Sequence, residues 1–143
     1  MYSVVKNNQN YRERKTRVVK TQKKSLPTSE ERAKMAALIA AENRGDNIIV
    51  LDLREITKNF DFFVIATGSS KRQLHAISEE IDNKFEKELG DKRMSISGYD
   101  ESRWIVLDYG DIIVHIFDAE TREYYAIEEL WGQGKTINWE NVD

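Results

Sequence analysis

The chain has 143 residues, a formal net charge of −3 and no cysteine. A chain of this length forms one domain with a single core, and the lack of cysteine excludes a disulfide, a thiolate metal site and a cysteine nucleophile. Since no apolar run could span a bilayer and no secretory signal is visible at the N-terminus, we expect a cytoplasmic protein that does not enter a membrane.

Charge is distributed unevenly along the chain. Residues 1–25 contain eight Lys and Arg residues against Glu13 alone, a net charge of +7, whereas the rest contains 14 basic and 24 acidic residues, a net charge of −10. We expect residues 1–27 to form a disordered basic arm that contacts phosphate groups nonspecifically, with a transit peptide as the alternative. The acidic body should attract a cationic protein surface.

The body begins with a predicted helix that Thr28 or Ser29 caps and that Gly45 ends. Its apolar residues at helical spacing are expected to face the core: Met35, Leu38 and Ile39. Two strands follow at 48–53 and 62–67. The second strand is apolar on both faces, which predicts a central position in the sheet.

A turn at 68–70 introduces a long helix that ends at Gly90. We interpret Gly68 as a turn residue and Ser69 or Ser70 as the N-cap. The alternative is a nucleotide-binding enzyme of nucleotidyltransferase type, whose phosphate would lie on exposed amides of this turn. Neither the paired strand carboxylates that hold divalent ions in such an enzyme nor a P-loop is present, so we predict no catalytic residue, metal or cofactor.

A short strand at 95–99 precedes the most informative segment, 103–117, where two β-branched runs flank the sequence Asp-Tyr-Gly-Asp and predict a β-hairpin. With Tyr109 and Gly110 at its tip, the expected facing pairs are Asp108 with Asp111, Val106 with Ile113, and Trp104 with His115. Because facing carboxylates repel, this end of the hairpin indicates either a metal site or a surface for a basic partner.

The final segment, 120–131, predicts one helix or two short ones with inward side chains at Tyr124, Ile127, Leu130 and Trp131. An alternative is that its aromatic side chains stay partly exposed as an interface. Residues 133–143 are expected to be a C-terminal tail. The order of elements predicts an α/β fold with a mixed β-sheet flanked by helices.

Several stretches of the chain resemble the ribosomal silencing factor (RsfS/Iojap) family. They are residues 61–73, Gly98 and Tyr99, 104–117, and 121–131, and they contain the patterns D-[FY]-F-x-I-x-[ST]-G-x-S, W-x-x-x-D-Y-G-D-x-x-V-H and R-x-x-Y-x-x-E-x-L-W. The resemblance places the family domain at 28–132 and leaves the arm and the tail outside it.

This resemblance implies a nucleotidyltransferase-like fold that lacks the catalytic carboxylates. It further implies binding to the large ribosomal subunit through ribosomal protein L-fourteen, which sterically blocks joining of the small subunit and represses translation when nutrients are scarce. Family members commonly form homodimers, and organellar relatives act in large-subunit assembly, so a role in ribosome biogenesis stays open. Any contact of the arm with ribosomal RNA should be nonspecific.

The residues and the resemblance both point to the hairpin as the partner-binding site. Its aromatic side chains would supply buried area, and its carboxylates would accept charge-assisted hydrogen bonds from a basic ribosomal protein. The predicted partner-binding residues are Trp104, Val106, Asp108, Tyr109 and Asp111. A third hypothesis is an RNA-binding factor that acts through its basic arm.

Overall fold

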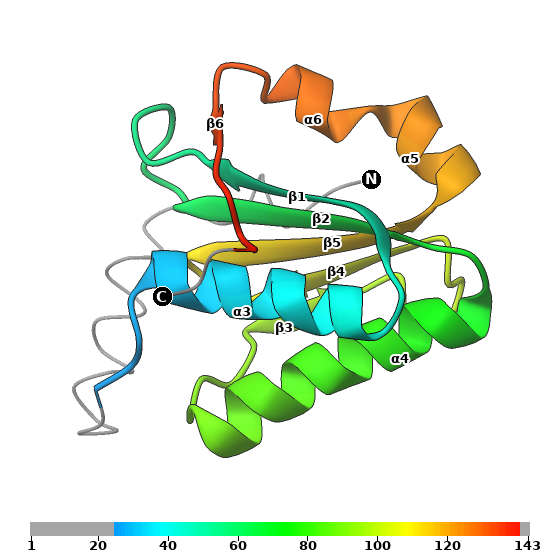
Figure 1. The fold of residues 1–143 in the computed structure, drawn as a ribbon, viewed down its shortest axis with the longest axis horizontal. Coiled ribbons are helices and arrows are strands. Elements are labelled where there is room, and N and C mark those ends of the chain that lie inside the picture. The colour runs from blue at the N-terminus through cyan, green and yellow to red at the C-terminus, as the bar shows by residue number, and fades with distance from the viewer. Residues whose placement is uncertain (1–24, 141–143) are drawn as a thin grey trace.

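A six-stranded sheet forms the centre of the structure, a computed structural model that describes residues 25–140 (Figure 1). The strands are β1 (Asp46–Asp52), β2 (Phe62–Gly68), β3 (Ser95–Ser97), β4 (Trp104–Asp108), β5 (Ile112–Asp118) and β6 (Lys135–Thr136). Their order across the sheet is β3-β4-β5-β2-β1-β6, with β2 and β5 parallel and the other neighbours antiparallel. The predicted α/β fold with a mixed sheet is therefore confirmed.

Helices lie on both faces of the sheet (Figure 1). One face carries α3 (Ser29–Glu42) and α4 (Lys71–Asn83), which continues as a π-helical turn (Lys84–Glu88). The other face carries the short helices α5 (Ala119–Tyr125) and α6 (Ile127–Leu130). None of the helices in residues 25–140 has both the length and the hydrophobicity needed to cross a membrane.

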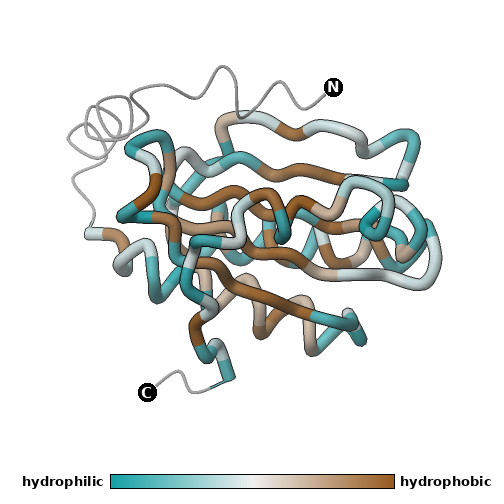
Figure 2. Tube along the Cα trace, turned by 90° about the horizontal axis from the view of Figure 1, so that it is seen from above, coloured by the Kyte–Doolittle hydropathy of each residue, from teal (hydrophilic) through white to brown (hydrophobic). Residues whose placement is uncertain are grey.

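Strand β2 is buried at all of its positions, which confirms its predicted central place. Because alternate residues of a strand point to opposite faces, the central strands supply a separate core on each side. Hydrophobic segments accordingly run through the middle of the molecule (Figure 2). We call the second of these cores, on the side of α5 and α6, the aromatic-face core: Leu51, Leu53, Phe60, Phe63, Ile65, Trp104, Val106, Ile113, Phe117 and Ile127.

Helix α3 begins with a capping box, in which the Thr28 hydroxyl accepts from the Glu31 amide while the Glu31 carboxylate accepts from the Thr28 amide. Of the large apolar residues predicted to face the core, Met35 and Ile39 pack against it, although they are only half-buried, as is Leu38. The fully buried positions are small ones: Ala33, Ala36, Ala37 and Ala40. Small side chains let the helix axis approach the sheet closely, and the larger residues then lie at its sides.

The C-terminal part differs from the prediction in two ways. Tyr124 and Leu130 are 80% and 78% exposed, so the expectation that they turn inward was wrong, whereas Ile127 is buried as predicted. The expected tail is also packed as far as residue 140. Strand β6 pairs with β1, and Trp139 packs on the core beside α3 and donates its indole N–H to the Ile48 carbonyl at 3.1 Å. Residues 1–24 of the predicted basic arm lie outside the described residues.

The predicted hairpin is present, but its register differs by two residues. Asp108 faces Ile113, Val106 faces His115 and Trp104 faces Phe117. Residues 109–112 form a wider tip that is closed by a hydrogen bond from the Tyr109 amide to the Ile112 carbonyl, at 2.9 Å. Asp108 and Asp111 therefore do not face each other, and the like-charge pair expected from the sequence is absent from the hairpin.

Candidate functional site

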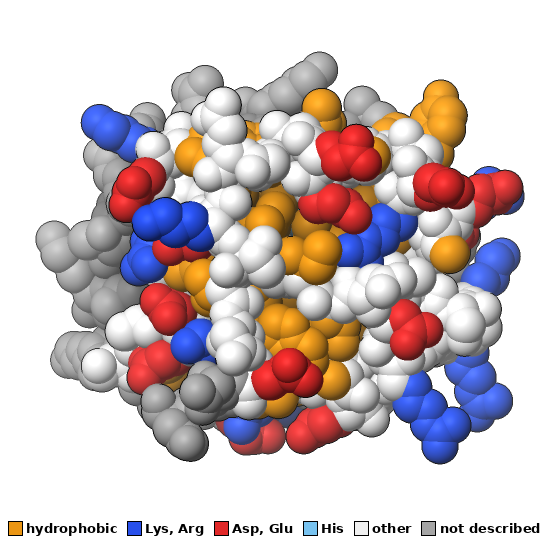
Figure 3. Space-filling model, turned by 45° about the horizontal axis from the view of Figure 1, so that its top comes forward, with side chains coloured by type: hydrophobic (Ala, Val, Ile, Leu, Met, Phe, Trp, Pro, Cys, Tyr) orange, Lys and Arg blue, Asp and Glu red, His pale blue; other side chains and the backbone are white. Residues whose placement is uncertain are grey.

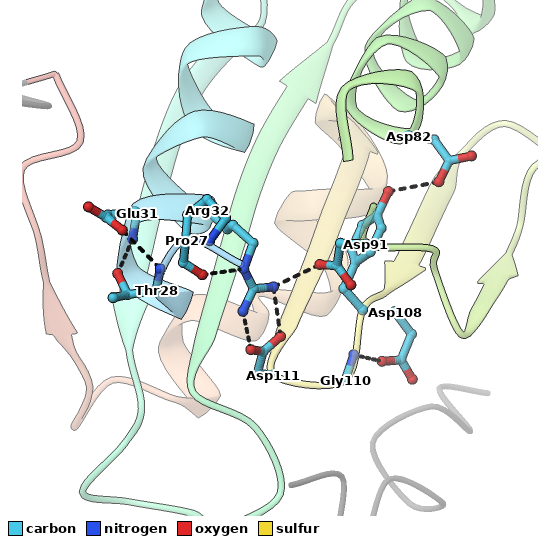
Figure 4. A network of polar contacts seen from close by, with 10 residues as sticks. Pro27, Thr28, Glu31, Arg32, Asp82, Asp91, Asp108, Gly110 and Asp111 are labelled. Carbon is cyan, nitrogen blue, oxygen red and sulfur yellow. Dashed lines mark hydrogen bonds and ion pairs between the residues drawn. The ribbon is translucent and has the colours of Figure 1, made fainter. Parts of the chain in front are cut away.

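The carboxylates at the hairpin tip bind groups of the same chain (Figure 4). Asp111 accepts two hydrogen bonds from the Arg32 guanidinium, which also donates to Asp91 at 2.8 Å. Burial disfavours the charge on Arg32, but the hydrogen bonds and charges of Asp111 and Asp91 outweigh it and raise the pKa of Arg32. The Asp108 carboxylate accepts from the Gly110 amide at 2.7 Å.

The Tyr109 side chain also points into the protein. Its side chain is fully buried, and its hydroxyl donates to Asp82 at 2.9 Å. Burial, followed by the neighbouring charge of Asp82, raises the pKa of Tyr109, so the phenol stays protonated. Three of the five predicted site residues thus take part in the internal structure of the tip: Asp108, Tyr109 and Asp111.

The other two predicted residues, Trp104 and Val106, lie on the aromatic face of β4. The Trp104 ring stacks on Phe117 at 4.7 Å and contacts Tyr125 at 4.8 Å between centroids. Its indole N–H donates to Nδ1 of His115 at 3.1 Å, which assigns the imidazole proton to Nε2. Burial lowers the pKa of His115 to about 3, so the ring is neutral and serves as an acceptor that orients Trp104.

Trp104 and Val106 line a groove of about 680 Å³ between the β3–β4 edge of the sheet and helix α5. We call it the Trp104 groove. Its lining combines aromatic side chains, exposed charges and backbone: Ser97, Gly98, Glu101, Arg103, Trp104, Val106, Glu120, Thr121, Tyr124 and Tyr125. A concave site that combines apolar rings with a few charged groups is typical of a binding surface.

Acidic side chains, with Lys and Arg side chains among them, surround the apolar centre of this face (Figure 3). The exposed residues of α5 and α6 include Glu120, Glu123 and Glu129, beside the exposed Tyr124 and Leu130. The only cation of these two helices, Arg122, is buried and paired. Large exposed apolar side chains within an acidic surface favour a partner that is both apolar and positively charged.

Helix α5 is fixed to the sheet by polar contacts that the sequence did not reveal. Asp118 caps its N-terminus by accepting from the Thr121 amide at 2.7 Å. Arg122 donates to the Asn47 carbonyl at 2.6 Å and to the Thr67 hydroxyl at 2.7 Å. These bonds join α5 to β1 and β2, so the Tyr124 side of the groove is held by the body of the sheet.

The turn after β2 has the structural role that we favoured from the sequence. The Ser70 hydroxyl accepts from the Gln73 amide and caps α4, and a Cβ on Gly68 would lie 2.6 Å from Leu74 Cδ1. Gln73 also accepts from the Ser69 amide and donates to the Asn43 carbonyl. Within residues 25–140, no three acidic or histidine side chains are grouped to hold a metal ion.

Comparison with known proteins agrees with this architecture. The family described as "Ribosomal silencing factor during starvation" matches residues 26–143. The chain belongs to this family. A crystal structure of a Chromobacterium violaceum protein superposes with a TM-score of 0.71 at 33% identity, over 78% of this chain and 92% of that one.

Relatives within the family carry two kinds of name. "Ribosomal silencing factor RsfS" of Halalkalibacterium halodurans is 32% identical over 115 residues, which are 80% of this chain and 97% of that protein. Its Bacillus subtilis counterpart is 38% identical over 69% of this chain and 83% of that protein. The mouse protein "Mitochondrial assembly of ribosomal large subunit protein 1" is 33% identical over 68% of this chain but only 43% of its own length.

Proposed function

We propose that this protein is a non-enzymatic silencing factor that binds the large ribosomal subunit in the cytoplasm. In this proposal it contacts ribosomal protein L-fourteen, sterically blocks joining of the small subunit and represses translation under nutrient limitation. The observation that supports it most is the Trp104 groove, because its exposed Tyr124 and surrounding carboxylates suit a basic protein surface. Family membership supports the same role.

The geometry also revises which side chains should touch the partner. Asp108, Tyr109 and Asp111 bind groups of their own chain, so we propose that they support the hairpin and that contact is made from the groove side. We propose that Trp104 and Val106 belong to the contact surface, which their position in the groove lining supports. Tyr124 and Tyr125 join them, with Glu120 as a charged neighbour.

Binding of purified ribosomal protein L-fourteen to the full chain tests this proposal. We expect saturable binding that weakens as salt is raised, because acidic side chains such as Glu120 face a cationic surface. The variant Glu120→Lys should bind more weakly, whereas Glu86→Lys, on the opposite face of the sheet, should bind like the wild type. Equal affinities of both variants, or no binding by the wild type, would contradict the proposal.

A second candidate function is assistance in assembly of the large subunit. The name of the mouse relative supports it, since that protein is described as acting in mitochondrial assembly of the ribosomal large subunit. Precursor particles of the large subunit should then accumulate in cells depleted of this protein, whereas a factor that only silences leaves subunit composition unchanged.

We also propose the homodimer that the family resemblance implies. A large apolar side chain that does not line the groove, Leu130, is mostly exposed in the single chain and would gain burial in a dimer. Light scattering of the purified protein measures its mass directly. A monomeric mass at micromolar concentration would contradict this part of the proposal.

A further inference from the structure

We propose that His75 and Ser102 are positioning residues, which hold the loop 98–103 in the conformation that forms one wall of the Trp104 groove. Neither residue lines the groove itself. The effect on partner binding rests on the proposed function, whereas the effect on the loop does not.

His75 holds the loop by stacking and by hydrogen bonds. Its ring lies parallel to the Tyr99 ring, with centroids 4.1 Å apart and an angle of 8° between the planes. Its Nε2 lies 2.9 Å from the Tyr99 carbonyl oxygen and 2.7 Å from the Ser102 hydroxyl. A carbonyl only accepts hydrogen bonds, so Nε2 of His75 carries the proton and donates to the Tyr99 carbonyl. The Ser102 hydroxyl donates to the same carbonyl at 2.9 Å.

Helix α4 also holds the other end of the Tyr99 side chain. The phenol donates to the carboxylate of Glu79, one helical turn after His75. This hydrogen bond is the main reason that the pKa of Tyr99 is raised, so the phenol remains a donor. Tyr99 therefore lies along one side of α4 with both its ring and its hydroxyl fixed.

Ser102 has a backbone conformation that needs such support. Its φ is 59°, in the left-handed region, and its side chain is buried. This conformation is strained for a non-glycine residue and persists where surrounding contacts fix it. The contacts here are the hydroxyl bonds to His75 and Tyr99 and a backbone bond from the Ser102 amide to the Gly98 carbonyl at 3.0 Å.

Both ends of the loop reach the groove. At the start, Gly98 lines the groove with a φ of 76°, and a Cβ there would lie 2.0 Å from the Trp104 carbonyl oxygen. At the end, the Arg103 carbonyl accepts from the amide of Asp118, the residue that caps α5. Between them lies Glu101, which also lines the groove. Release of the loop from α4 would therefore move three residues that line the groove: Gly98, Glu101 and Arg103.

The test compares variants that remove one kind of contact at a time. His75→Phe keeps a ring for stacking but loses the hydrogen bonds, His75→Gln keeps an amide donor, and Ser102→Gly removes the hydroxyl while permitting the positive φ. Arg72→Ala, at an exposed position of the same helix, is the control. Amide hydrogen exchange of residues 98–103 and affinity for purified large ribosomal subunits are both measured in the full-length proteins.

We expect His75→Phe and Ser102→Gly to speed exchange of the loop and to weaken binding, each about tenfold, as the loss of a typical hydrogen bond implies. His75→Gln should recover most of both effects, and Arg72→Ala should show neither. Unchanged exchange in His75→Phe would overturn the proposal, and so would faster exchange with unchanged affinity. Failure of the wild type to bind subunits would instead refute the proposed function, and loop exchange would still decide the role of His75.

Discussion

Arg32 and Asp111 form a buried bidentate ion pair that joins the first turn of helix α3 to the tip of the β4–β5 hairpin (Figure 4). The side chains are only 4% and 14% exposed. The guanidinium also donates to Asp91 and to the Pro27 carbonyl. Two of the residues predicted from the sequence as partner contacts, Asp111 and Tyr109, thus fix the hairpin to the rest of the fold.

Replacement of Arg32 by Met should destabilise the protein strongly. Two carboxylates would lose their common partner within a buried site, and breaking a buried ion pair costs about 3–5 kcal/mol in free energy of unfolding. Urea unfolding followed by circular dichroism measures this quantity. The control is Lys34→Met on the same helix, whose pair with the half-exposed Glu30 should contribute about 0–1 kcal/mol. Equal losses in the two variants would contradict the structural role of Arg32.

His115 should make stability depend on pH. Burial lowers the pKa of this ring to about 3 in the folded protein, against about 6.5 in the unfolded chain. Because the unfolded state binds the proton more readily between these values, stability falls as pH falls below about 6.5. Linkage gives a loss of about 2 kcal/mol from this residue between pH 7 and pH 5.

The variant His115→Gln separates this contribution from that of the carboxylates. Glutamine keeps an acceptor for the Trp104 indole but does not titrate. Urea unfolding at both pH values should therefore show a smaller pH dependence in the variant than in the wild type, by about 2 kcal/mol. If the two proteins showed the same pH dependence of stability, then either His115 is protonated in the folded state or the pH dependence has another source.

Tyr124→Ala should weaken binding to the large subunit without loss of stability. Its side chain is 80% exposed, so its removal leaves the core unchanged, whereas an exposed tyrosine at the centre of an interface contributes about 2 kcal/mol or more. We expect an affinity at least tenfold lower in cosedimentation, with an unchanged unfolding midpoint. Ile56→Ala, at an exposed apolar position outside the groove, should bind normally.

Trp104 is a less suitable probe of binding, although the sequence pointed to it first. Its ring is 8% exposed and stacks on Phe117, so Trp104→Ala should cost about 3–5 kcal/mol of stability in addition to any loss of affinity. Wild-type affinity of Tyr124→Ala would show that the partner binds elsewhere.

Deletion of residues 1–24 should weaken binding only modestly. This segment carries all eight Lys and Arg residues of the basic arm and can add nonspecific contacts with ribosomal RNA phosphates. Such contacts depend steeply on salt, so the difference from the full chain should be several-fold at low salt and should vanish near physiological ionic strength or above. Complete loss of binding on deletion would favour the RNA-binding hypothesis.

Some features of the hairpin were predictable from the sequence and others were not. Its two strands, and the central position of β2, follow from long β-branched runs, because such runs have few alternatives to a buried strand. The register was wrong because strands that are apolar on both faces carry no alternation to fix it. The observed register goes with the local bonds of the tip, where the Tyr109 amide donates to the Ile112 carbonyl and the Gly110 amide donates to Asp108.

The errors in the helices have a common physical cause. Hydrophobicity singles out large side chains, but α3 buries its alanines completely and Met35 only partly. In α5, the contacts of Arg122 with Asn47 and Thr67 set the orientation of the helix and turn Tyr124 outward. Contacts between residues so distant in the chain are not visible in local periodicity. The sequence therefore pointed to the Trp104 side of the groove, and it offered exposed aromatic side chains of the final segment only as an alternative.

Subunit joining tests the central claim most directly. Purified large and small ribosomal subunits are mixed under conditions that favour joining, with and without an excess of this protein, and are separated on a sucrose gradient. The account predicts that the peak of joined ribosomes falls, that free subunits rise, and that the protein sediments with the large subunit. Normal joining in the presence of excess protein would contradict it.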